Sequence, residues 1–231
     1  LIGKVSPSGK LAVTFPLSYG QIPSAKTFPG EVVEEKSFVS PNFVDMSPID
    51  KSRLSYDEGI YVGYRYFDTF EQPVSYPFGY GLSYSTFEYS HLSLSDRRLH
   101  DQMTVTLNVT NTGTVPGKEV VQLYISAPQK GLEKPTKERK GFAKTVELTP
   151  GQVETLTFRL TPESLASFDG KRHVWVTEKG KYQVSIGASS RDIRVQRAFG
   201  VNKSKIVSKS LASFPSITPD ELTRTPTSTK K

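Results

Sequence analysis

Carboxylates are the residues of this sequence whose types and spacing come nearest to a recognisable chemistry. Asp57 and Glu58 are adjacent, and Arg65 and Asp68 follow them in the same Tyr-rich segment. Hydrolysis of a glycosidic bond needs two carboxyl groups that flank the bond, one as acid and one as nucleophile or base. Adjacent residues of an extended chain point to opposite faces, so Asp57 and Glu58 do not readily flank one bond. Salt bridges and turns are the roles we favour for them.

Motifs for metal, cofactor or nucleophilic chemistry are absent from the sequence. The histidines, His91, His100 and His173, form no HxxH or HExxH arrangement, and there is no GxSxG elbow and no cysteine. The glycines around Tyr80 lack the third glycine and the strand-to-helix context of a phosphate-binding loop. The residues alone therefore name no active site, and we predict no metal and no cofactor.

Aromatic side chains are concentrated in residues 56–95, which are dense in Tyr, Phe and Gly. Aromatic rings stack on the apolar faces of sugars, although a cluster of this kind more often packs in a core or between domains. A stand-alone carbohydrate-binding or adhesion module that uses Tyr61 and Tyr80 is the alternative function that this segment leaves open.

The composition excludes several classes of protein. The chain has 231 residues, of which 35% are hydrophobic and 11% aromatic, and its formal net charge is +7. Wholesale disorder is excluded because disordered chains are poor in aromatic and β-branched residues. No apolar run approaches the ~20 residues of a membrane-spanning helix, so we expect no membrane span. The lack of cysteine excludes disulfides and thiolate chemistry.

Residues 201–231 differ in composition from the rest of the chain. They are rich in Ser, Thr and Pro, and they contain six Lys or Arg residues against two acidic ones. More than half of the net charge thus lies in a tail that we expect to be solvated and partly disordered. Because the predicted strands carry no basic stripe, we predict no nucleic-acid partner.

The elements that would position these residues are mainly short strands. From about residue 96 to 200, apolar and polar residues alternate with period two, most clearly over 104–110, and turn residues separate the runs. About seven such strands predict an antiparallel β-sandwich of about 100 residues. Residues 10–15 and 60–66 also have the pattern of strands, and residues 163–167 that of a helical turn.

Several segments, taken in order, resemble glycoside hydrolase family 3. Three of them are similar to motifs of that family: residues 7–16 (PSGKLAVTFP), 56–68 (YDEGIYVGYRYFD) and 77–87 (PFGYGLSYSTF). Others are similar to parts of its fibronectin type III-like domain: residues 111–113, 117–124, 140–142, 165–169 and 187–193. The resemblance covers roughly residues 1–200 and departs at Ala12, where the family usually has Pro.

The resemblance implies a mainly β fold in which a fibronectin type III-like (immunoglobulin-like) antiparallel β-sandwich follows the end of an α/β sandwich domain. Residues 1–30 would be the C-terminal remnant of the α/β domain and 31–95 an aromatic-rich connecting layer. Residues 96–200 would be the fibronectin type III-like domain and 201–231 a basic tail. The start at Leu1, without an initiator Met, leads us to expect that the chain continues a longer polypeptide.

The resemblance also implies the activity of a retaining β-glycosidase that acts on terminal β-linked glucosyl or xylosyl residues. In that family the nucleophilic Asp lies in a (β/α)8 barrel and the acid/base Glu in the following α/β sandwich domain, both before the PSGKL-like motif. We therefore expect no catalytic residue in this chain, which would be inactive alone. Its partners would be those upstream domains and, in the intact enzyme, a β-linked oligosaccharide or glycoside. Periplasmic or extracellular localisation is expected from the resemblance.

The resemblance assigns the connecting layer a supporting role at the domain seam, which here means the boundary between the sandwich and the catalytic domains. Its rigid Tyr and Phe side chains would hold the sandwich against the catalytic domains. We expect Glu58 and Arg65 to make polar contacts at this seam, and Tyr61 and Tyr80 to be its aromatic binding residues. These four are the candidate site residues.

Overall fold

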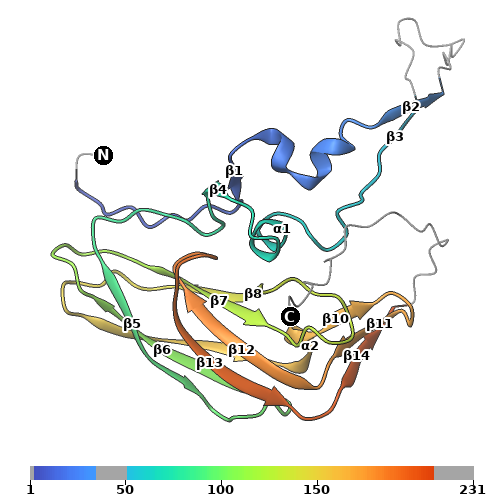
Figure 1. Cartoon of the computed structure of the whole chain (residues 1–231). Helices are drawn as coiled ribbons and strands as arrows, with labels where there is room; N and C mark the ends of the chain where they lie inside the picture. Colours follow the sequence, from blue (N-terminus) through green and yellow to red (C-terminus); the bar gives the residue numbers. More distant parts are fainter. Residues whose placement is uncertain (1–2, 35–50, 211–231) are drawn as a thin grey trace, which may run out of the picture.

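The computed structural model describes residues 3–34 and 51–210. A β-sandwich is covered on one side by segments from the N-terminal part of the chain (Figure 1). We call residues 3–34 and 51–86 the N-terminal layer and residues 87–201 the sandwich. No helix in these described ranges is long and apolar enough to cross a membrane.

The sandwich consists of two antiparallel sheets, one with the strand order β5-β6-β9 and one with the order β13-β12-β7-β8. The strands are β5 Phe87–Leu94, β6 Met103–Asn111, β7 Val120–Ser126, β8 Glu138–Lys144, β9 Val153–Leu160, β12 Gly180–Gly187 and β13 Ile193–Val201. The predicted antiparallel sandwich is confirmed. Its three-stranded sheet includes β5, which precedes residue 96 and pairs with β6.

A smaller sheet with the order β10-β11-β14 lies at one end of the sandwich (Figure 1). Its strands are β10 Ser167–Asp169, β11 Val174–Thr177 and β14 Lys205–Lys209. β14 belongs to residues 201–231, so part of the segment expected to be a solvated tail is a strand. Residues 211–231 lie outside the described ranges. The predicted helical turn is α2, Pro162–Leu165, whose first turn is capped by the side chain of Thr161.

The core lies between the two large sheets, where the alternation of the sequence places it. In β6 every second residue is buried, from Met103 to Asn111. Apolar residues from the other strands complete the core, among them Leu123, Leu156, Phe158, Leu160, Val184 and Ile186. At roughly 25 cal/mol for each Å² of apolar surface removed from water, this burial is the main favourable contribution to folding of the sandwich.

Strand β7 is buried on both of its faces over residues 121–125. Its inward residues join the core, whereas Gln122 and Tyr124 face the N-terminal layer. Gln122 Nε2 donates to the carbonyl of Gly79 at 3.1 Å, and the ring centroids of Tyr124 and Tyr64 are 6.0 Å apart. The layer therefore covers the outer face of the four-stranded sheet.

The N-terminal layer contains only short elements. They are β1 Phe15–Pro16, 3-10 turns at Tyr19–Gln21 and Pro23–Lys26, β2 Glu31–Glu34, β3 Lys51–Arg53, α1 Tyr64–Thr69 and β4 Val74–Tyr76. β1 pairs with β4, and β2 pairs with β3 in a hairpin that points away from the sandwich (Figure 1).

Two strand predictions in this layer are wrong. Most of residues 60–66 form the approach to α1 and its first turn, because Gly63 adopts a φ of 58° before the helix and Tyr64 and Phe67 both turn inward, at helical spacing. In residues 10–15 only Phe15 is in a strand. The backbone of Leu11 bonds instead to Gly79 and Tyr80, each at 2.8 Å, in a loop rather than a ladder.

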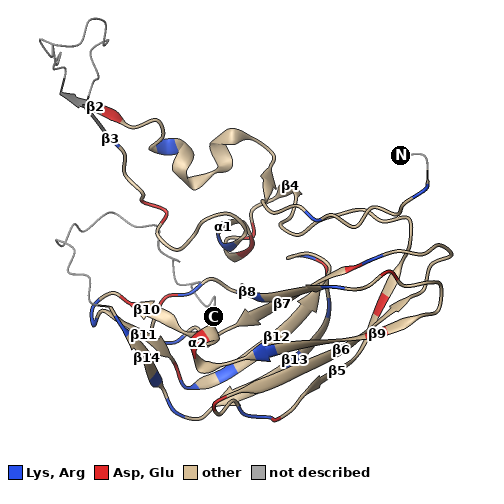
Figure 2. Cartoon of the chain, turned by 180° about the vertical axis from the view of Figure 1, so that it is seen from behind, with Lys and Arg blue, Asp and Glu red and all other residues tan. Residues whose placement is uncertain are grey.

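Charged residues are distributed over the molecule in separate patches of both signs (Figure 2). Lys and Arg patches on β12, β13 and β14 alternate with acidic positions on neighbouring segments, and the strands show no continuous positive stripe in this view. The absence of a nucleic-acid partner stays a prediction from the sequence.

Candidate functional site at the seam between layer and sandwich

Helix α1 is attached to the sandwich by one buried carboxylate. Only 4% of the Asp68 side chain is exposed, and its Oδ1 accepts from Arg191 Nε at 2.7 Å while Oδ2 lies 3.3 Å from Lys137 Nζ. Arg191 Nη2 also donates to the carbonyls of Phe67 and Gln72, at 3.1 and 2.7 Å. These carbonyls lie at and just beyond the C-terminal end of α1, where backbone oxygens lack partners within the helix. Arg191 therefore fixes both the side chain and the end of the helix.

A second set of contacts joins the start of α1 to β8. Arg65, one of the four candidates, lies 3.0 Å from Glu138 Oε1. The backbone N–H of Arg139 donates to the hydroxyl of Tyr64 at 2.7 Å, and the Tyr64 ring stacks on Phe78 with a centroid distance of 4.7 Å. Arg65 thus makes a polar contact between the layer and the sandwich, both within this chain.

Tyr61 and Glu58 lie just before α1. The Tyr61 side chain is fully buried, its hydroxyl donates to Glu133 Oε1 at 2.7 Å, and its ring meets Phe70 edge-on at 4.9 Å. The Tyr61 ring therefore offers no face to a sugar here. Glu58 accepts a hydrogen bond from the Tyr61 N–H through its carbonyl, and its Oε2 is buried without a hydrogen-bond partner among the described residues.

Tyr80, the fourth candidate, lies apart from these three, beside a second buried carboxylate, Glu119. Glu119 is 3% exposed, and its Oε1 accepts from the Tyr89 hydroxyl at 2.8 Å and from Lys10 Nζ at 3.3 Å. Burial, and then the charge of Glu119, raise the pKa of Tyr89, so its hydroxyl remains a donor at ordinary pH. The Arg194 guanidinium lies 4.6 Å above the Tyr89 ring.

Gln122 holds the PFGYG segment against the sandwich. Its Nε2 donates to the carbonyls of Gly79 and Ala188, and its Oε1 accepts from the Tyr124 hydroxyl at 2.6 Å. Gly79 has a φ of 81°, and a Cβ there would lie 2.2 Å from Gln122 Oε1. Only glycine fits this close approach without strain.

Exposed apolar side chains are concentrated in the N-terminal layer. Twelve of the nineteen large hydrophobic residues that are exposed in the described chain belong to it: Val5, Val13, Phe15, Leu17, Tyr19, Phe28, Tyr56, Ile60, Val62, Tyr76, Leu82 and Tyr84. A cavity of about 560 Å³ opens between residues 7–15 and 76–82, and Phe15, Tyr76 and Leu82 line it. Exposed apolar side chains that gather around a cavity in this way are typical of an interaction site.

The role that the seam residues support is attachment of the layer to the sandwich. The polar groups form ion pairs and hydrogen bonds between the layer and the sandwich, and no group of three or more His, Asp or Glu residues in ranges 3–34 and 51–210 could hold a metal ion. Asp68, Glu119 and Arg191 are the seam residues that we did not select from the sequence. Asp68 and Glu119 stand beside apolar residues, which is a sequence signal for a buried charge, whereas Arg191 lies between Ser190 and Asp192 and carries no such signal.

Comparison with known proteins first identifies the domain family to which the sandwich belongs. Residues 119–190 match the family model of the fibronectin type III-like domain. The solved structure of β-glucosidase 3B from Thermotoga neapolitana in complex with glucose superposes with a TM-score of 0.78 at 42% identity. That superposition covers 90% of this chain and 26% of the other.

Two curated relatives extend the comparison. Thermostable β-glucosidase B of Acetivibrio thermocellus is 39% identical over 211 residues, and an exo-α-(1→6)-L-arabinopyranosidase of Bifidobacterium breve is 38% identical over 193 residues. These matches cover 90% and 84% of this chain, which spans about a quarter of each relative's length. The chain belongs to glycoside hydrolase family 3 and corresponds to the C-terminal part of such an enzyme.

Proposed function

We propose that this chain is the accessory C-terminal portion of a retaining β-glycosidase that removes terminal β-linked glucosyl or xylosyl residues, and that it is inactive alone. The observation that carries this proposal is the exposed apolar surface of the N-terminal layer. The layer is joined to the sandwich by buried ion pairs, and it also exposes twelve large apolar side chains. Catalytic domains of the same enzyme are the partner that would cover these side chains.

The division of the chain follows from the same proposal. Residues 1–30 complete an α/β sandwich domain and 31–95 form the connecting layer, except that β5 within this range is a strand of the sandwich. Residues 96–200 form the rest of the fibronectin type III-like domain, and 201–231 form a basic tail. The names of the relatives support a sugar substrate, since they include a β-glucosidase and an arabinopyranosidase. We place the enzyme in the periplasm or outside the cell, a location that cell fractionation tests.

An activity assay on the isolated 231-residue chain tests the catalytic part of this proposal. With aryl β-glucosides and aryl β-xylosides, we expect no turnover above the uncatalysed rate, because we place both catalytic carboxylates in domains outside this chain. Turnover that is lost on replacing Glu58 or Glu119 by Gln would overturn the statement that the chain is inactive alone.

A further inference from the structure

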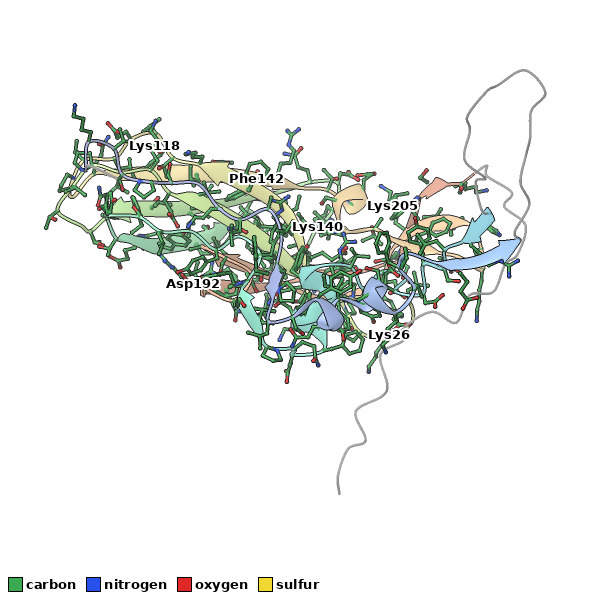
Figure 3. The ribbon with its side chains drawn as sticks, turned by 90° about the horizontal axis from the view of Figure 1, so that it is seen from above. Lys26, Lys118, Lys140, Phe142, Asp192 and Lys205 are labelled. Atoms are coloured by element: carbon green, nitrogen blue, oxygen red, sulfur yellow. The ribbon has the colours of Figure 1, made fainter. Side chains whose placement is uncertain are left out.

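A second cavity, of about 550 Å³, lies where the layer, β5 and the β12–β13 connection meet. Its walls include Lys10 and Tyr80 from the layer, Glu119 before β7, and Asp192 and Arg194 after β12. Figure 3 labels Asp192 on the connection between β12 and β13. We call this the seam cavity, and its volume is in the range of small-molecule sites.

Glu119 is the most buried charged group in the wall, with 4% of its side chain exposed. Lys10 and Tyr89 both bond to its Oε1, so its second oxygen, Oε2, remains available to a group in the cavity. Across the cavity, Arg194 Nη2 pairs with Asp192 Oδ2 at 2.9 Å and its Nη1 donates to the carbonyl of Phe87 at 2.7 Å. The acceptors and donors of the wall are thus held in fixed positions by their other partners.

The charges of the wall exclude several kinds of ligand. An anion would face the carboxylates of Glu88, Glu119 and Asp192, whereas a metal ion would face the cations of Lys10 and Arg194. An apolar molecule would remove these charged groups from water without replacing their hydrogen bonds, which is costly. A neutral molecule rich in hydroxyls suits the wall, because each hydroxyl both donates and accepts.

The remaining wall residues fit the same class of ligand. Ser83 and Thr86 contribute hydroxyls, and Tyr80 contributes an aromatic ring that is partly buried and packs on Tyr76 at a centroid distance of 5.0 Å. Carboxylates and cations beside an aromatic ring present hydrogen-bonding groups for hydroxyls together with an apolar surface for the C–H face of a pyranose. We propose that the seam cavity binds a neutral pyranose sugar, with Glu119 and Asp192 as acceptors and Lys10 and Arg194 as donors.

Sugar binding at this cavity requires both the layer and the sandwich but no catalytic domain. A titration of the isolated chain, followed by the NMR shifts of its backbone amides, tests it with methyl β-D-glucopyranoside and cellobiose as probes. We expect saturable shifts at Gly81, Glu119 and Ser189, with a dissociation constant of about 0.1–10 mM. Because no turnover is measured, failure here and failure of the proposed glycosidase role are separate outcomes.

Matched variants decide whether the cavity is the site. Asp192→Asn, at a half-exposed carboxylate, and Glu119→Gln should each weaken binding at least about fivefold, since each loses a charged acceptor. Glu147→Gln changes a residue that lines a different cavity and should bind as the parent chain does. Amide dispersion in the same spectra shows that each variant is folded.

Three results would overturn the proposal. The first is the absence of saturable shifts in a folded chain with either sugar. The second is equal affinity in Asp192→Asn, Glu119→Gln and the Glu147→Gln control. The third is saturation of the same amides by sulfate or calcium at lower concentration than by sugar, which would show that the cavity selects an ion.

Discussion

Asp68 is the residue that joins the two parts of the molecule most directly. Its nearly buried carboxylate receives one cation from the β12–β13 connection, Arg191, and one from the approach to β8, Lys137. Removing one member of such a group leaves the remaining charges without compensation, which costs more than the pair itself contributes. Both cations keep part of their surface in water, which moderates that cost.

The variant Asp68→Asn tests this joint. We expect its free energy of unfolding to fall by about 1–3 kcal/mol, because two cations lose their carboxylate and the end of α1 loses its support. Urea titration followed by circular dichroism measures the change. Asp101→Asn is the control, since Asp101 is fully exposed and lies 3.8 Å from Lys205, and we expect a change below about 0.5 kcal/mol there. Equal effects in the two variants would contradict the role of Asp68.

Tyr182 makes the stability of the folded chain depend on pH, and the direction of this dependence follows from the surroundings of its hydroxyl. Burial in the core, followed by the nearby charge of Glu178, raises the pKa of Tyr182 from 10.0 to about 12. The pKa of Tyr182 is higher in the folded chain than in the unfolded chain. The stabilisation that its protonated hydroxyl contributes is therefore fully present below about pH 10 and is lost as pH rises from there through about pH 12.

The comparison of the parent chain with Tyr182→Phe isolates this effect. Between about pH 10 and 11, we expect the stability difference between them to shrink by about 1 kcal/mol, because only the parent loses the contribution of a protonated phenol. Below about pH 9 the difference should be constant, which serves as the internal control. A difference that stays constant up to about pH 11 would show that the hydroxyl titrates normally.

Residue contacts at the seam were only partly predictable from the sequence. Arg65 and Tyr61 were selected, and both reach the sandwich, but their acidic partners Glu138 and Glu133 carry no motif. Tyr61 and Glu133 are 72 positions apart in the chain. Pairings of this kind arise from docking of one part of the molecule on another, which local patterns do not encode.

At the scale of elements, the alternation of apolar and polar residues marks most clearly those strands that are covered on only one face. β6 follows the alternation throughout, because its inward residues meet only the opposite sheet. β7 does not, because the layer buries Gln122 and Tyr124 on its outer face. The alternation over residues 60–66 was misleading for a related reason, since Tyr64 and Phe67 face the seam at helical spacing.

Gly79 provides a test of how closely the PFGYG segment must approach β7. Gly79→Ala should destabilise the chain by about 1–3 kcal/mol, because its φ is positive and the new Cβ would collide with Gln122. Gly170→Ala is the matched control, because the space around Gly170 is open and its φ needs no glycine. Thermal unfolding of both variants measures the effect, and a neutral Gly79→Ala would contradict the close packing described.

At the scale of the whole molecule, the N-terminal layer combines buried contacts with exposed apolar groups. It is joined to the sandwich through buried polar groups such as Asp68 and Glu119, and it also carries twelve exposed large apolar side chains. Apolar surface of this extent is stabilised by cover from another domain. The relatives are about four times as long as the matched region, and domains corresponding to their remaining parts are the cover that we propose.

A graft onto a relative measures this central claim most directly. β-Glucosidase 3B of Thermotoga neapolitana would be cut before the region that matches this chain, which is 26% of its length, and residues 1–210 would replace that region. Hydrolysis of an aryl β-glucoside would be compared among the intact enzyme, the truncated enzyme and the graft. We predict that truncation abolishes activity and that the graft restores at least about a tenth of it, because we propose that the N-terminal layer supports the catalytic domains. A graft that is folded throughout yet as inactive as the truncated enzyme would contradict the account.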